Sequence, residues 1–365
     1  MRPRKSDLLM DLAGRPERLG IALALASAAL FGASTPLAKA LLGDVSPWML
    51  AGLLYLGSGI GLFIVSLIQR WSDGEIAEAP LRAADLPWLA AVVLSGGVAG
   101  PLLLMAGLAA TPASTASLLL NLEGIFTLAI AWTIFRENVD LRVGIGAAAI
   151  LAGALLLSWS GGVTGVGWGA AAIGGACLAW AIDNNLTRKL SSADPLQIAM
   201  IKGIAAGAVN VGLAAALQLR WPATTVIIAA GIVGFLGYGV SLTCFVLALR
   251  HLGAARTGAY FSLAPFVGAA IAIVGFGDPV TPLFLAAAAL IAVGLYLHLA
   301  EEHAHDHVHE PMTHEHRHTH DAHHQHTHGP SDPGDEPHTH VHVHARIVHR
   351  HPHYPDIHHR HSHGS

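Results

Sequence analysis

Residues 113–135 read ASTASLLLNLEGIFTLAIAWTIF, an apolar stretch with one charged residue, Glu123, near its middle. A helix needs about 20 apolar residues to cross the hydrocarbon core of a bilayer, and this stretch has that length. A charged side chain at the centre of such a helix is disfavoured by roughly 2.5–3.5 kcal/mol. The stretch therefore predicts a membrane-spanning helix whose acid is neutral, paired or facing a wet cavity.

Similar apolar stretches fill most of the chain on both sides of this one. The ten predicted spans are residues 19–42, 48–69, 86–109, 113–135, 143–159, 168–189, 196–219, 224–249, 257–276 and 282–299. Only 12% of residues are charged and 53% are hydrophobic, whereas soluble proteins are about 25% charged. The predicted fold class is an all-α integral membrane protein with ten transmembrane helices, followed by a His-rich tail.

The distribution of Lys and Arg predicts the orientation of the spans. The basic residues before the first span resemble a signal peptide, but the apolar run is long and many spans follow, so we interpret it as an uncleaved helix. With an inner N-terminus, the inner joints hold Arg70, Arg82, Arg136, Arg142, Arg188, Lys189, Arg250 and Arg256, and the outer joints only Lys39 and Arg220. This bias predicts a multi-pass protein of the cell inner membrane with both termini in the cytoplasm.

The two halves of the predicted body repeat each other. Leu122-Glu123-Gly124 and Phe135-Arg136-Glu137 recur 141 residues later as Leu263-Ala264-Pro265 and Phe276-Gly277-Asp278. An odd number of spans per half makes the halves inverted repeats, which is typical of secondary transporters. The predicted organisation is a cytoplasmic arm (1–18), two five-helix repeats (19–159 and 167–299) and a His-rich cytoplasmic tail (300–365).

Two five-helix halves with these fourth-helix motifs resemble the EamA family of the drug/metabolite transporter superfamily. The resemblance covers about residues 19–299 and implies transport of a small molecule. The family favours Leu-Glu-Pro, whereas this chain has Gly124 in place of Pro in the first half and Ala264 in place of Glu in the second. If the acid acts in transport, only Glu123 supplies it.

The candidate substrate- or ion-binding residues are Glu123, Asp183, Asn184, Asn185 and Lys202. Glu123 is interpreted either as a proton carrier or substrate contact, or as a carboxyl group hydrogen-bonded to a neighbouring helix. Asp183 and Lys202 each lie about six residues from the inner end of consecutive antiparallel helices, at a depth of roughly 9 Å. They are expected to pair, either as a structural clamp or as part of a substrate site.

The tail holds 23 of the 25 histidines, many at every second position. Its candidate metal ligands are His303, His305, His307, His309, His314, His316, His318, His320, His323, His324, His326, His328, His338, His340, His342 and His344. Imidazole and carboxylate donors without thiolate suit Zn, Ni or Co. The composition predicts a disordered tail with several exchangeable sites, and adventitious binding is the alternative.

The functional prediction is a secondary transporter working by alternating access, with export of a divalent metal or metal-regulated transport as variants. The alternative is a metal-responsive receptor without transport. An intramembrane enzyme is disfavoured because no HExxH or GxSxG motif lies within the predicted spans. No cofactor is required by the sequence. The expected partners are a small-molecule substrate, membrane lipid and divalent metal ions, with a homodimer left open and nucleic acid disfavoured by a formal net charge of −4.

Overall fold

The computed structural model describes a helical body and four strands of the tail. The described residues are 16–73, 81, 83–134, 141–159, 167–187, 190, 194–299, 303–309, 312–318, 338–344 and 347–353. Most of the predicted arm at 1–18 lies outside them. The chain divides into two compact units, one formed by Met1–Asp73 with Pro80–Glu301 and the other by Gly74–Ala79 with Glu302–Ser365.

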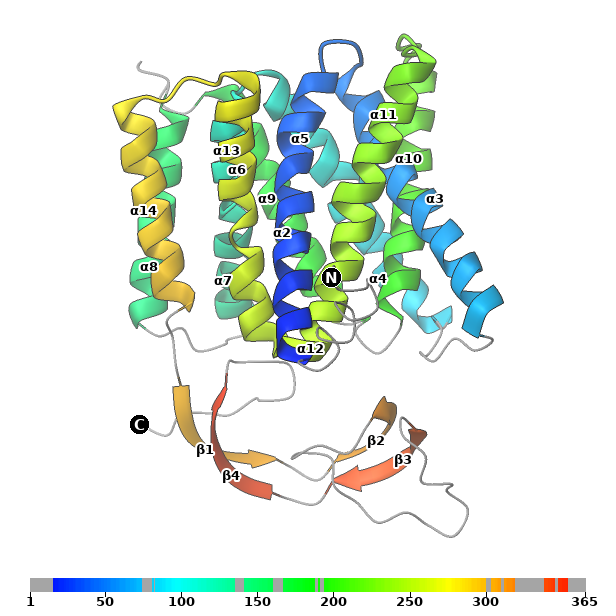
Figure 1. Cartoon of the computed structure of the whole chain (residues 1–365), viewed down its shortest axis with the longest axis vertical. Helices are drawn as coiled ribbons and strands as arrows, with labels where there is room; N and C mark the ends of the chain where they lie inside the picture. Colours follow the sequence, from blue (N-terminus) through cyan, green and yellow to red (C-terminus); the bar gives the residue numbers. More distant parts are fainter. Residues whose placement is uncertain are drawn as a thin grey trace, which may run out of the picture. The chain divides into compact units, whose positions relative to one another are not determined.

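The helical body is built from the elements labelled in Figure 1. Its first half contains α2 (Pro16–Leu41), α3 (Pro47–Asp73), the 3₁₀ turn η1 (Ala83–Asp85), α4 (Leu86–Val92), the π-helical η2 (Val93–Ala99), α5 (Gly100–Ala109), α6 (Ala113–Leu119), α7 (Leu122–Thr133) and α8 (Leu141–Ser158). Its second half contains α9 (Trp168–Thr187), α10 (Pro195–Ala216), α11 (Thr224–Gly234), the π-helical η4 (Phe235–Val240), α12 (Ser241–Phe261), α13 (Ala264–Phe276) and α14 (Pro282–Leu299).

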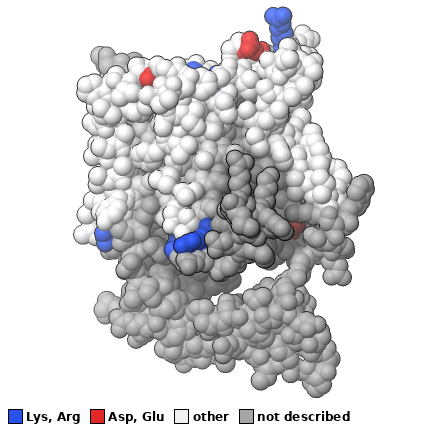
Figure 2. All heavy atoms as spheres, in the orientation of Figure 1, with Lys and Arg blue, Asp and Glu red and all other residues white. Residues whose placement is uncertain are grey.

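Within the described residues, eight helical segments are long and apolar enough to cross a membrane. They are Arg18–Leu41, Pro47–Ile68, Ala83–Ala109, Ala113–Thr133, Leu141–Ser158, Leu196–Ala216, Thr224–Leu249 and Arg256–Phe276. On the face drawn in Figure 2, the described charged side chains lie near the two ends of the helices, with an uncharged band between them. A multi-pass membrane protein is the architecture that fits this surface.

Two of the ten predicted spans do not meet the same measure of length and hydropathy. The last apolar helix is shorter, Pro282–Leu297. The other is α9, which is long enough but contains Asp183, Asn184 and Asn185 near its end. These polar side chains lower its hydropathy, so the count of ten is not reached by composition alone.

The fifth helices of the two halves, α8 and α14, pack through a symmetric contact. A Cβ atom added at Gly153 would lie 2.7 Å from Ile291 Cγ1 and 2.8 Å from the Ala287 carbonyl oxygen. A Cβ atom added at Gly294 would lie 2.7 Å from Ile150 Cγ1 and 2.5 Å from the Gly146 carbonyl oxygen. The members of each contact are related by the same 141-residue offset, so the halves meet about a pseudo-two-fold axis. Small residues at such contacts allow close packing of membrane helices.

Helix interruptions also repeat between the halves. The helices α6 and α7 separate at Asn121, whose Nδ2 donates to the Leu118 carbonyl oxygen at 2.8 Å. The helices α12 and α13 separate at Ser262, whose Oγ donates to the Ala259 carbonyl oxygen at 2.6 Å. A side chain that donates a hydrogen bond to a nearby backbone carbonyl competes with the backbone hydrogen bonds of the helix. The π-helical segments η2 and η4 likewise lie in equivalent helices, one in each half.

The described part of the tail contains four strands in two antiparallel pairs. Strand β1 (His303–His309) pairs with β4 (Ile347–His353), and β2 (Met312–His318) pairs with β3 (His338–His344). These strands depart from the disordered tail that composition predicted. Histidine alternates with other residues at a period of two, which is the side-chain period of a strand. This alternation accounts for the strands that composition alone did not predict.

Candidate functional site

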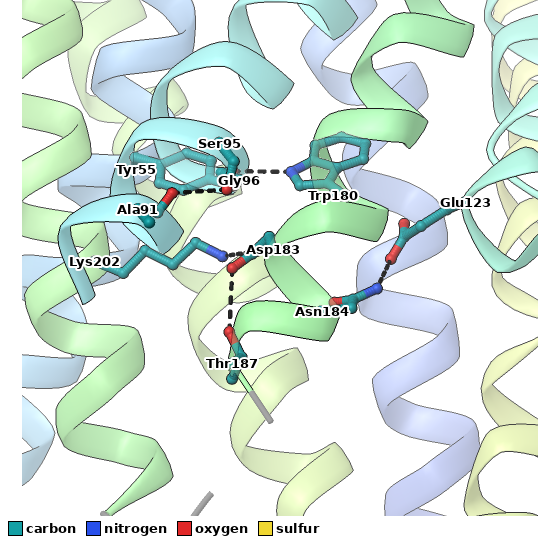
Figure 3. Close-up of polar contacts among 10 residues, drawn as sticks. All are labelled: Tyr55, Ala91, Ser95, Gly96, Glu123, Trp180, Asp183, Asn184, Thr187 and Lys202. Carbon is teal, nitrogen blue, oxygen red and sulfur yellow. Dashed lines mark hydrogen bonds and ion pairs between the residues drawn. The ribbon is translucent and has the colours of Figure 1, made fainter. Parts of the chain in front are cut away.

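Asp183 and Lys202 form an ion pair between α9 and α10 (Figure 3). Thr187 Oγ1, one turn further along α9, donates to Asp183 Oδ1 at 3.2 Å. The Asp183 side chain is 6% exposed and that of Lys202 is 19% exposed. Both carboxylate oxygens are thus occupied, and the two charges offset each other.

The glycine pair of η2 adjoins this ion pair. A Cβ atom at Gly96 would collide with Asp183 Oδ2, so this position admits only glycine without movement. The Gly96 carbonyl oxygen accepts hydrogen bonds from Tyr55 Oη and Trp180 Nε1, both at 2.9 Å (Figure 3). A π-helical turn shifts the backbone hydrogen-bond pattern of a helix and frequently marks a functional site. The sequence analysis did not identify this role, because no side chain signals it.

Glu123 lies beside α9 on another side from Lys202 (Figure 3). Its Oε1 accepts a hydrogen bond from Asn184 Nδ2 at 2.8 Å. Glu123 is half-buried and Asn184 is exposed. Within the described residues, the side-chain partner of Glu123 is therefore a neutral amide, and its charge has no cation in direct contact.

Asn184 is exposed on a face of α9 that is otherwise buried. Asn184 shares a face of α9 with Ile173, Cys177 and Trp180, at helical spacings of four, three and four residues. Those three side chains are buried, and Cys177 Sγ lies 3.7 Å from the Leu119 carbonyl oxygen of α6. Asn184 is thus an exposed polar side chain on a face of α9 whose other members are buried, and it is the hydrogen-bond partner of Glu123.

Asn185 does not join the other candidate residues. Its Nδ2 donates to the Ala181 carbonyl oxygen at 2.8 Å within α9. The side chain is buried, and its Oδ1 has no hydrogen-bond partner within the described part of the chain. Four of the five predicted residues thus form two neighbouring pairs, and Asn185 lies apart.

An aromatic cluster that sequence reasoning did not identify joins the two halves. Tyr238 of η4 lies 5.9 Å from Phe31 and 5.7 Å from Tyr55, measured between ring centroids. Phe261 of α12 lies 5.3 Å from Phe31. Tyr55 belongs both to this cluster and to the Gly96 contacts, so the aromatic cluster adjoins the Asp183–Lys202 pair. Only the spatial arrangement of α2, α3, η4 and α12 brings these rings together.

The histidines predicted as metal ligands fall into two groups. Eleven of the sixteen lie in strands β1, β2 and β3, and the exceptions are His320, His323, His324, His326 and His328. The five exceptions lie outside the described residues. Where the structure describes side chains, it contains no group of three or more His, Cys, Asp or Glu side chains arranged to hold a metal ion.

Comparison with known proteins gives three similarities. The model of the EamA-like transporter family matches residues 18–159 and 167–300. An uncharacterized transporter of Methanothermobacter thermautotrophicus is 30% identical over 267 residues, covering 68% of this chain and 77% of that protein. A solved crystal structure that is 18% identical has a TM-score of 0.57 and matches 77% of this chain and 98% of its own chain. At that identity the last similarity concerns the fold alone.

Proposed function

The chain belongs to the EamA-like transporter family, and from this premise we propose that it is a secondary transporter that moves a small molecule across the bacterial inner membrane by alternating access. The observation that carries the proposal is Glu123, a half-buried acid that has no cationic partner in the described structure and accepts a hydrogen bond from the exposed amide of Asn184. Polar residues inside a membrane are expensive and are retained mainly at substrate and ion pathways.

Ten spans are part of this proposal. The polar end of α9 contains the residues of the candidate site, so its low hydropathy is the expected consequence of a functional role. The last helix, α14, packs against α8 by the symmetric glycine contact and completes the second half. Counting α9 and α14 with the eight apolar segments gives two halves of five spans each.

We assign different roles to the two polar pairs. The Asp183–Lys202 pair fixes α9 against α10, because both carboxylate oxygens have partners within the protein. Glu123 is the group that exchanges a proton or binds a polar group of the substrate, since its side-chain partner among the described residues is a neutral and exposed amide. The transporter then performs no covalent chemistry.

Contacts at the end of α2 support a closed state of one entrance. Lys39 Nζ donates to the carbonyl oxygens of Leu108 at 2.5 Å and Ala109 at 3.2 Å. Asp278 Oδ2 accepts from the Ser114 backbone nitrogen at 2.8 Å and attracts the Lys39 charge. These closing contacts link the first half to the joint after α13, so they would have to break for that entrance to open.

Loss of the closing contacts is expected to open the entrance at the end of α2. In a Lys39→Met, Asp278→Asn variant, a membrane-impermeant thiol reagent applied from that side should label Asn184→Cys faster than in the otherwise unchanged protein. Cys244→Ser removes a background thiol from both proteins. Arg220→Met is the matched control, because it removes an exposed cation from another joint. Equal labelling rates would remove the gating role of these contacts.

The orientation proposed here places both termini in the cytoplasm. Reporter fusions after Gly14 and after Glu302 should both show cytoplasmic activity, because five inner segments hold most of the Lys and Arg residues and the span count is even. A periplasmic signal at one fusion would contradict the count of ten, and at both would reverse the orientation.

The tail is proposed to bind Zn, Ni or Co ions in the cytoplasm and to buffer or sense them. Neutral imidazole is the ligating form, and its unperturbed pKa of about 6.5 makes much of the tail available at pH 7. The ion would then be either a regulator of transport or the substrate itself.

Growth of a deletion strain against a series of metals and metabolites, followed by uptake into vesicles containing the purified protein, tests the function. Accumulation of one compound above that in protein-free vesicles is expected. Failure of every compound that rescues growth to accumulate, with intact metal binding, would favour a receptor that does not transport.

A further inference from the structure

The pairing of the tail strands sets histidine opposite histidine. In the β1–β4 ladder the paired positions include His303 with His353, His305 with His351 and His307 with His349. In the β2–β3 ladder they include His314 with His342, His316 with His340 and His318 with His338. Each ladder therefore has three consecutive cross-strand histidine pairs.

Register decides whether those pairs share a face. Directly opposed residues of an antiparallel ladder lie on the same face, and positions two apart return to that face. A slip of one residue would transfer the histidines of one strand to the opposite face. Both ladders have the register that gathers six histidines on one face, while the alternate positions hold pairs such as Asp306 with Arg350 and Val308 with Val348.

We propose that each of these histidine faces is a binding site for a divalent metal ion such as Zn²⁺, and that metal binding holds the ladders together. The inference rests on the proposed metal-binding tail and specifies its sites. Two adjacent pairs supply four imidazoles, the number that a tetrahedral zinc site takes. The central sets are His305, His307, His349 and His351 in one ladder, and His314, His316, His340 and His342 in the other. His349, His351 and His353 were not among the ligands predicted from the sequence.

The energetics of a two-stranded ladder explain why a metal ion would matter. An isolated two-stranded ladder is marginally stable in water. Opposed histidines repel each other once protonated, since like charges directly across a ladder are destabilising. A metal ion coordinated by histidines of both strands requires neutral imidazoles, so the repulsion is absent. The binding free energy of the ion is then added to the stability of the ladder. Ladder formation should therefore increase with metal and decrease as pH falls from 7.5 toward 5.

The nested pairing gives metal binding a structural consequence. Strand β1 begins directly after the helical body, whereas β4 is the last strand, and the β2–β3 ladder lies between them in sequence. Joining β1 to β4 closes the whole intervening segment into a loop. The state of the tail, extended or closed, would thus depend on the metal concentration.

The test exchanges neighbouring residues in β3 without changing composition. In the full-length protein, T339H/H340T/V341H/H342V moves two histidines of β3 to the opposite face of the ladder. The matched control, R360H/H361R/S362H/H363S, makes the same kind of exchange after β4, at histidines that are not among the candidate ligands. Zn²⁺ binding is measured by competition with a chelator at pH 7.5. The β3 exchange should weaken the tightest class of sites at least about tenfold, a loss that even an outer-shell substitution can produce, whereas the control should bind as the unaltered chain does.

A second measurement follows the ladder itself. Nitroxide labels at Val308→Cys and Val348→Cys, opposed in the β1–β4 register, should show dipolar broadening on addition of Zn²⁺, in a Cys177→Ala, Cys244→Ser background. Equal zinc affinity in the exchange variant and its control, or no broadening, would overturn the ladder sites while the metal-binding tail stands. No zinc binding by the unaltered chain would remove the metal-binding part of the proposed function as well.

Discussion

Replacement of Glu123 by glutamine is expected to reduce gradient-driven transport to the level of protein-free vesicles while the protein remains folded. Glutamine keeps the Oε1 acceptor for Asn184 and nearly the same shape, but it cannot release a proton or carry a negative charge. The thermal unfolding midpoint in detergent should therefore stay close to that of the wild type, with a change in free energy below about 1 kcal/mol. Uptake and unfolding measured on one preparation separate the two effects.

The matched control for this prediction is Asp44→Asn. Asp44 is exposed in the joint between α2 and α3, so the substitution removes one acid without touching the candidate site. Transport by this variant should equal that of the wild type. If Glu123→Gln also transports normally, the carboxyl group has a packing role and the proton or substrate must use another group.

The helical body was predictable because the hydropathy and length of each segment can be read directly from consecutive residues. Hydropathy and length located the apolar segments, and the 141-residue offset located equivalent positions such as Glu123 and Ala264. The Asp183–Lys202 pair was predicted by depth alone, since two consecutive antiparallel helices place residues at equal distances from the same membrane surface side by side.

Several features of the candidate site have no local sequence signal. The π-helical turn η2 exposes the Gly96 carbonyl oxygen to Tyr55 and Trp180, which come from two other helices. The aromatic cluster likewise depends on which helices are neighbours in space. Asn185 was grouped with Asp183 and Asn184 by proximity in sequence, but a helix turns about 100° per residue and directs it elsewhere.

The tail was interpreted from its composition, and composition does not tell which residues of two strands are paired. Its polar residues cannot bury a core, which predicts disorder. The alternation of histidine is a separate signal, and it becomes informative only when β1 is aligned with β4 and β2 with β3.

Asp183→Asn is expected to destabilise the protein by about 3 kcal/mol, because it leaves the Lys202 charge in the membrane without its counter-ion. Removal of one partner of a buried ion pair typically costs about 3–5 kcal/mol. The lower end applies here because Lys202 is 19% exposed and can recruit some solvent. Unfolding of the purified protein in detergent, followed against temperature and denaturant, measures the loss.

The second substitution, Lys202→Met, distinguishes a clamp from a binding site. Methionine fills the volume of the lysine stem without a charge, so Asp183→Asn combined with Lys202→Met should recover more than half of the lost stability, and the two effects should be clearly non-additive. If the pair only fixes α9 against α10, the double variant should also recover transport. Recovery of stability without recovery of transport would instead place Asp183 or Lys202 in contact with the substrate, and additive losses would show that the pair is not the source of the stability. Recovery of transport is expected because both carboxylate oxygens of Asp183 already have partners, Lys202 and Thr187. Glu123, whose partner is a neutral amide, is the acid that can exchange its partner for a proton or a substrate group.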